Sequence, residues 1–142
     1  MNVLDVNVVI PLYRGDHSHH AAATAWWQQS VTAGETFTVP DLVWVGFVRM
    51  ITNRRVFPEP SAFRDAWEFA AALMAQPTYT TWTAHPRTLE EFTALSAQAG
   101  ARADLVTDAY IAACAATYGG TVVTFDRDFR KFDGLRVHEL TL

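Results

Sequence analysis

Two aspartates in this chain each follow a short apolar run of the kind that forms buried strands. Asp5 follows residues 3–4, and Asp126 follows the β-favouring residues 122–125. In open α/β sheets, ligands bind outside the carboxyl ends of the strands. If the two strands are parallel neighbours, both carboxylates emerge at the same edge of the sheet.

Three further acids are expected near that edge. The helix expected over residues 104–118 feeds the strand that precedes Asp126, so the helix runs antiparallel to the strand and begins at the same edge. Asp104 and Asp108 are four residues apart and therefore share a helix face, and Asp128 follows Asp126 by two residues. Asp104 is explained equally well as the helix N-cap, and Asp128 as a turn residue.

Converging carboxylates require a physical reason, because two such charges about 4 Å apart repel by about 4 kcal/mol at an effective dielectric near 20. A divalent cation removes that cost. Mg²⁺, or Mn²⁺ in its place, prefers oxygen ligands and can activate water for attack on a phosphodiester. The sequence has no Cys/His set at zinc spacing. Asp5 and Asp108 lie inside apolar stretches, where a lone buried charge is expensive.

The elements that must position these acids alternate between short strands and helices. This alternation predicts one domain over residues 1–142, an α/β/α sandwich with a mostly parallel central sheet. Strands are expected near residues 3–5, 36–39, 121–124 and 135–138, and helices over 18–31, 40–52, 88–99 and 104–118.

Apolar and β-favouring residues elsewhere in the chain mark further expected packing positions. Phe63, Trp67, Ala70 and Met74 recur at helical spacing and predict one apolar helix face. Trp67 on this face is expected to make core or dimer contacts. Residues 78–82 are rich in β-favouring types. Trp44 is the tryptophan expected to lie beside the acidic site.

Composition narrows the function classes. The chain has 142 residues and a net charge of −4, which disfavours a protein that coats nucleic acid but allows a focused acidic site. No apolar run reaches the roughly 18 residues of a membrane span, and the N-terminus does not resemble a signal peptide. The single Cys114 fits a reducing compartment and is expected to be a packing residue. A cytoplasmic protein is therefore expected.

Four motifs in fixed order resemble those of PIN-domain nucleases, and specifically the VapC-type toxins of bacterial toxin–antitoxin pairs. The resemblance covers nearly the whole chain. It lies in residues 3–7 (VLDVN), residues 47–52 (FVRMIT) with 55–57 (RVF), residues 105–113 (LVTDAYIAA) and residues 123–129 (VTFDRDF).

This resemblance implies roles for individual residues. By position, Asp5 and Asp108 are similar to the family's principal metal ligands. Asp126 completes the cluster, and Asp128 is an outer or occasional direct participant. Asn7 and Thr124 resemble residues that position the ligands or bind phosphate through water, and Arg49 resembles a helix arginine that pairs with an acid or meets the RNA backbone.

The chain departs from the family pattern at one position. PIN domains usually have a glutamate about three residues before the helix arginine, and this chain has Gly46 there. We hypothesise that Asp41, which precedes the same helix, substitutes for the glutamate directly or through water.

The resemblance implies a metal-dependent endoribonuclease that cleaves structured RNA such as tRNA or rRNA and inhibits translation. It also implies a small VapB-type antitoxin partner and a homodimer, for which the helix around Trp67 and Phe69 is a candidate surface. Three alternatives remain open: a phosphatase or DNA nuclease using the same metal site, a non-catalytic RNA- or antitoxin-binding regulator, and a plain structural domain.

Overall fold

A computed structural model describes residues 1–142 and contains one four-stranded sheet in which all pairs are parallel. The strand order is β2-β1-β3-β4, where β1 is Asn2–Leu4, β2 is Phe37–Thr38, β3 is Thr121–Thr124 and β4 is Arg136–Glu139. Leu4 of β1 is in register with Val123 of β3. The two strands that precede Asp5 and Asp126 are therefore parallel neighbours, which meets the condition for both carboxylates to emerge at one edge of the sheet.

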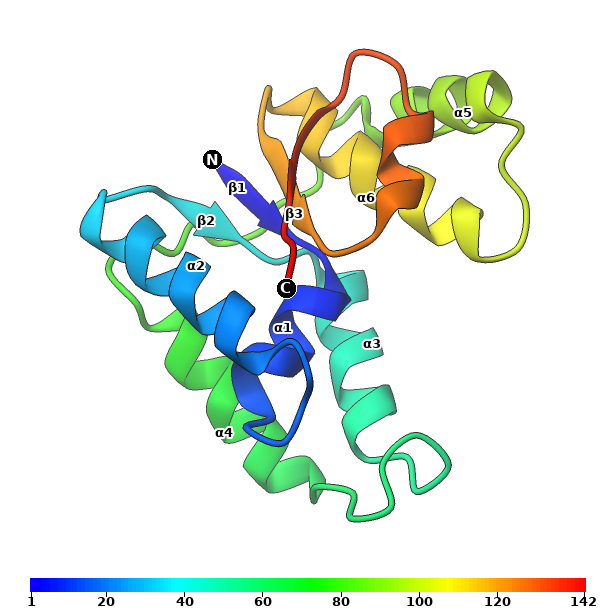
Figure 1. The fold of residues 1–142 in the computed structure, drawn as a ribbon. Helices are drawn as coiled ribbons and strands as arrows, with labels where there is room; N and C mark the ends of the chain where they lie inside the picture. Colours follow the sequence, from blue (N-terminus) through cyan, green and yellow to red (C-terminus); the bar gives the residue numbers. More distant parts are fainter.

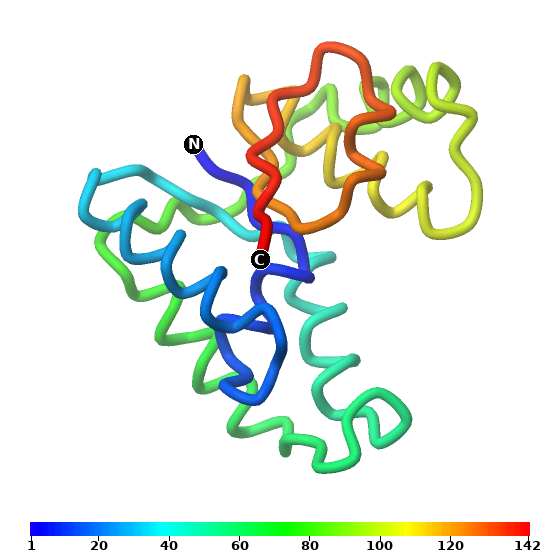
Figure 2. The backbone as a smooth tube through the Cα atoms, in the orientation of Figure 1, coloured from blue at the N-terminus to red at the C-terminus, as the bar shows by residue number.

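The helices cover both faces of the sheet, which confirms the predicted three-layer architecture. In Figure 1, α5 and α6 lie together on one side, and α1 to α4 gather on the other. Figure 2 follows the same division along the backbone, from the blue-to-green helices to the yellow and orange ones. The helices are α1 (Val6–Tyr13), α2 (His20–Thr32), α3 (Asp41–Ile51), α4 (Phe63–Met74), α5 (Thr88–Ala99), α6 (Asp104–Thr117) and the short 3₁₀ helix η1 (Arg127–Lys131). None is long and apolar enough to cross a membrane.

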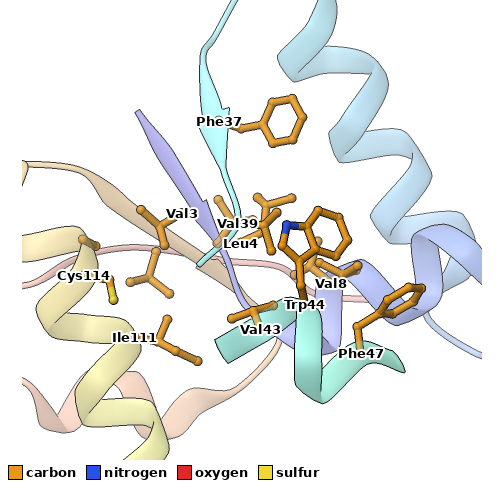
Figure 3. Close-up of a cluster of buried hydrophobic side chains, with 14 of the residues drawn as sticks. Val3, Leu4, Val8, Phe37, Val39, Val43, Trp44, Phe47, Ile111 and Cys114 are labelled. Carbon is orange, nitrogen blue, oxygen red and sulfur yellow. The ribbon is translucent and has the colours of Figure 1, made fainter. Parts of the chain in front are cut away.

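The hydrophobic core joins the strands to α1, α3 and α6. Figure 3 shows Leu4, Trp44 and Ile111 meeting in this cluster, each from a different element. Trp44 is 3% exposed and packs edge-on against Phe47. Trp44 is therefore a core residue, and its predicted place beside the acidic site is wrong. Cys114 is buried, in agreement with its predicted packing role.

The turn between α6 and β3 makes the two elements antiparallel, and this places the start of α6 near the site. Gly119 has a φ of +64°, a conformation that ends helices and favours glycine. At Gly120 a Cβ atom would lie 2.8 Å from the Met1 carbonyl oxygen, so a side chain would push the first strand away. The chain thus reverses tightly into β3, and the first turns of α6 lie at the carboxyl edge of the sheet.

The apolar face expected on α4 is only partly buried. On α4 the buried residues are Ala66, Ala70 and Leu73, whereas Phe63 and Trp67 are 62% and 41% exposed and stack on each other. Small alanines let α4 approach the core closely, which leaves Phe63 and Trp67 on the outside. Phe69 is half-buried against Tyr13 and Phe47, so it is not part of an exposed surface for a dimer. Residues 78–82, which are rich in β-favouring types, form one isolated bridge, between Tyr79 and Phe37.

Candidate metal centre

Asp5 lies at the junction of β1 and α1, where the strand ends and the helix begins. Its Oδ1 accepts a hydrogen bond of 2.7 Å from the backbone N–H of Val6, so Asp5 caps α1. Its own backbone N–H donates to the Val123 carbonyl oxygen at 3.1 Å, which continues the pairing with β3. The side chain is only 3% exposed. The carboxylate is therefore held in place from both elements.

Thr124, the last residue of β3, links Asp5 to Asn7 and Asp126. Its buried hydroxyl donates to Asp5 Oδ2 at 2.7 Å. The same oxygen accepts hydrogen bonds from the backbone N–H of Asp126 at 2.9 Å and from Asn7 Nδ2 at 3.1 Å. Asn7 Oδ1 accepts from the N–H of Phe125 at 3.1 Å. The side chains of Thr124 and Asn7 thus fix the turn that carries Asp126.

Asp108, Asp126 and Asp128 form a cluster at this edge. One oxygen from each carboxylate lies within 4.8 Å of the others. Asp126 Oδ1 accepts from the N–H of Asp128 at 2.8 Å, while Asp128 pairs with Lys131 at 3.1 Å. Asp108 has no ion-pair partner. The cluster therefore has excess negative charge centred on Asp108.

Burial and mutual repulsion raise the pKa values of two of these acids. The pKa of Asp5 is raised from 3.8 to about 6, mainly by burial, although the hydrogen bonds from Thr124 and Val6 oppose the shift. The pKa of Asp108 is raised from 3.8 to about 7, first by burial and then by the charges of Asp5, Asp126, Asp128 and Asp104. The repulsion connects Asp5 electrostatically to the three-residue cluster.

A cleft of about 200 Å³ opens between α3 and α6 beside these acids. Asp5 and Asp108 line it from one side. Arg49 and Gly46 line it from α3, and the Arg49 guanidinium has no ion-pair partner. The cleft thus combines a carboxylate pair with a free cation.

This donor set suits a hard divalent cation. Carboxylate oxygens are the preferred protein ligands of Mg²⁺ and Mn²⁺. Asp108 has no cation to offset its charge, and Asp126 has one oxygen that accepts no hydrogen bond. The raised pKa values indicate that the arrangement is costly until positive charge is added.

The sequence matches known families along most of its length. Residues 3–135 match the PIN domain family. The chain is 40% identical over 136 residues to Ribonuclease VapC25 of Mycobacterium tuberculosis, covering 96% of both chains. It is 35% identical over 136 residues to Ribonuclease VapC43 of the same organism, covering 96% of this chain and 92% of the relative. The chain belongs to the VapC family of PIN-domain proteins.

Solved structures share the fold of this PIN domain. VapBC2 from Rickettsia felis, bound to a DNA fragment from its promoter, gives a TM-score of 0.74 at 12% identity, covering 99% of this chain and 98% of that chain. VapC20 of Mycobacterium tuberculosis, a sarcin–ricin loop cleaving toxin, gives 0.69 at 17% identity, covering 96% and 99%. At these identities the likeness establishes the fold alone.

Two residues predicted for the site of this PIN domain lie at its margin. Asp41 is exposed in the first turn of α3, does not line the cleft, and is absent from the charges that raise the pKa of Asp108. This placement argues against Asp41 as a substitute for the missing glutamate. Asp104 is the first residue of α6, and Ala103 is the N-cap, so the N-cap interpretation is wrong. Asp104 is exposed and acts on Asp108 only through its charge.

Sequence reasoning missed the apolar wall of the cleft. Leu42, Val45 and Met50 of α3 line it, and Leu42 and Val45 are 45% and 65% exposed. Together with Gly46 and Arg49 they lie on one face of the helix, at three, four, seven and eight residues after Leu42. That spacing was available in the sequence, but the same apolar pattern also describes an ordinary core-facing helix.

Proposed function

We propose that this PIN domain is the toxin of a toxin–antitoxin pair and acts as a divalent-metal-dependent endoribonuclease. The observation that supports this proposal most directly is the cluster of Asp108, Asp126 and Asp128 at the sheet edge where the charge of Asp5 also raises the pKa of Asp108. The cleft beside it also holds an arginine without an ion-pair partner. The ribonuclease names of relatives that align over nearly the whole chain support RNA as the substrate.

The residues of the site have separable roles in this proposal. Asp5, Asp108 and Asp126 would hold the cation, and Asp128 would join them after releasing Lys131. A bound divalent ion supplies Lewis acidity for phosphodiester hydrolysis. Thr124 and Asn7 hold Asp5 and Asp126 in position through the hydrogen bonds described above. Arg49 meets the negative charge of the RNA backbone at the rim of the cleft.

A cleavage assay on total cellular RNA tests this proposal. Wild type with Mg²⁺ or Mn²⁺ is expected to give discrete fragments, and Asp108→Asn none. Asp65→Asn, an exposed acid on α4, is the matched control and should cleave like wild type. DNA and a generic phosphate monoester incubated in parallel identify a DNA nuclease or a phosphatase. Metal and RNA binding without any cleavage would favour the non-catalytic regulator, for which the absence of an acid at Gly46 is the supporting observation.

The RNA class is proposed to be structured RNA, tRNA or rRNA. The structural neighbour that cleaves the sarcin–ricin loop supports this choice. Wild type that degrades unstructured oligonucleotides and folded tRNA or rRNA at equal rates, at every linkage, would contradict it. Discrete cuts in a folded loop are the expected result.

We further propose a small antitoxin of the VapB type as the partner. The exposed Leu42 and Val45 beside the acidic cleft provide an apolar surface for such a partner, and solved neighbours include complexes titled VapBC. Co-expression with a short reading frame encoded beside the gene should yield a stable complex in which cleavage is inhibited.

A homodimer is proposed through the stacked Phe63 and Trp67. Trp67→Ala should then lower the molar mass measured by light scattering.

A further inference from the structure

Gly46 occupies the middle of α3 without a packing reason. Glycine weakens a helix interior relative to alanine. Some glycines are needed because another group approaches closely, but a Cβ atom at position 46 would meet only Val6 Cγ2, at 4.0 Å. The residue therefore leaves open space beside α3 instead of allowing close packing.

That open space is the cleft that contains Asp5 and Asp108. Leu42, Val43 and Met50 line it from α3, and Ile111 lines it from α6. A side chain at position 46 would project into this volume of about 200 Å³. An apolar cavity of roughly 150 Å³, lined by Leu, Ile and Phe, is sufficient to bind benzene. The cleft thus has room for one flat ring.

We infer that this cleft is a nucleobase subsite, which receives one of the two bases that flank the scissile phosphate and whose depth is set by Gly46. The inference rests on the proposed ribonuclease function and adds a specificity element to it. Proteins that recognise RNA loops commonly splay out a base and stack it on an aromatic ring or an arginine plane. Enzymes that act on an extruded base hold it in a pocket between aromatic or apolar side chains. A phosphate attached to that nucleotide would lie toward Asp5 and Asp108, the end at which a cation binds.

The surroundings favour a nucleotide over an apolar side chain of a protein partner. The walls of the cleft include two acids and an arginine without an ion-pair partner, which suit a metal-bridged phosphate. A guanidinium also offers a plane on which a base can stack. An apolar side chain would bury Asp5 and Asp108 further without adding positive charge.

The test combines a cleft-filling substitution with removal of the base. Gly46→Leu fills the space with a good helix former, and Gly46→Ala fills it partly. The substrate is an RNA that wild type cleaves, with an abasic nucleotide placed on either side of the cleaved linkage. At one of these positions the abasic change should lower kcat/KM of wild type by about tenfold or more. Gly46→Leu should lower kcat/KM on the intact RNA similarly and lose nothing more on the abasic RNA.

A binding measurement provides a second readout that needs no metal. With 2-aminopurine at the sensitive position and a chelator present, wild type should change the emission of the base on binding, and Gly46→Leu should not. Ala72→Leu adds similar bulk at an exposed position of α4 and should behave like wild type.

Several outcomes would overturn the subsite. Equal abasic effects in wild type and Gly46→Leu would do so, as would a loss of cleavage that tracks a loss of Mn²⁺ affinity. If the Gly46→Leu variant cleaves normally but no longer binds the antitoxin, the cleft is a binding site for the antitoxin and not for a base. Wild type that cleaves no RNA would refute the proposed function itself, which is a distinct result from a cleaving enzyme that ignores the flanking bases.

Discussion

Thr124 is the residue on which the geometry of the acids depends most. One buried hydroxyl donates to Asp5 and accepts from the N–H of Asp126, so it connects the ends of β1 and β3. Its hydrogen bond also lowers the pKa of Asp5 against the effect of burial. The hydroxyl therefore both places the carboxylate and favours its charged form.

We predict that Thr124→Val weakens Mn²⁺ binding by about 10- to 100-fold, the usual effect of losing a partner that orients a metal ligand. Valine has a similar shape but leaves Asp5 Oδ2 and the N–H of Asp126 without their partner. Isothermal titration of Mn²⁺ measures the effect, and Thr124→Ser should restore most of the affinity. Unchanged affinity in Thr124→Val would remove the positioning role.

At the scale of elements, the start of α6 depends on an unusual backbone conformation. Ala103, the N-cap of α6, has φ 52° and ψ −130°, which residues with a side chain rarely adopt. This turn leads the chain from α5 into α6 and sets the direction from which Asp108 reaches the site. Strain of this kind costs about 1–3 kcal/mol.

We predict that Ala103→Gly stabilises the protein by about 1 kcal/mol, because the relief of strain exceeds the entropic cost of glycine. Chemical denaturation measures the change. Ala101→Gly, two residues earlier and without positive φ, should be neutral or destabilising. A comparable loss of stability in both variants would show that Ala103 is not strained.

The elements were predictable from sequence to different degrees. The strands that precede Asp5 and Asp126 and the buried helix α6 were predicted correctly, because their apolar runs and the Gly119-Gly120 stop are local signals. The exposed face of α4 was not predicted correctly, because the spacing of its large aromatics does not reveal that the alanines between them pack inward. The ion pair of Lys131 with Asp128 also escaped prediction, because it depends on the tight turn of η1.

At the scale of the whole molecule, the acidic centre makes stability depend on pH and on metal. Asp5 and Asp108 have folded pKa values of about 6 and about 7, both raised from 3.8. The unfolded chain releases these protons at lower pH than the folded protein does. Their contribution to stability is therefore fully present below pH about 4 and is lost as pH rises through about 6 and 7.

We predict that the metal-free protein melts several degrees lower at pH 8 than at pH 5.5. Between pH 5.5 and pH 8, ionisation of Asp5 and Asp108 lowers the free energy of unfolding by about 1–2 kcal/mol. This figure includes a reduced contribution from Asp108, because that side chain is partly exposed to solvent. Mn²⁺ should raise the melting temperature at pH 8, because it binds only the folded site. Asp108→Asn should flatten the pH dependence and respond little to Mn²⁺. A melting temperature of wild type that rises from pH 5.5 to 8 in chelator would contradict the raised pKa values.

The position of the cleft was the least predictable feature of the whole molecule. Its walls come from the start of α1, from α3 and from α6, and α3 and α6 are separated by more than fifty residues in the chain. The absence of a side chain at Gly46 leaves part of its volume open. The resemblance to PIN domains indicates that a glutamate is missing there, but only the folded structure reveals that the space stays open.

The central claim is that Asp5, Asp108 and Asp126 tolerate one another because they hold a divalent cation. Isothermal titration calorimetry of Mn²⁺ into metal-free, antitoxin-free protein at pH 7.5 tests it most directly. We predict saturable binding by wild type that is abolished in Asp108→Asn and kept in Asp65→Asn. Absence of binding by folded wild type, or binding of equal strength in Asp108→Asn, would contradict the claim.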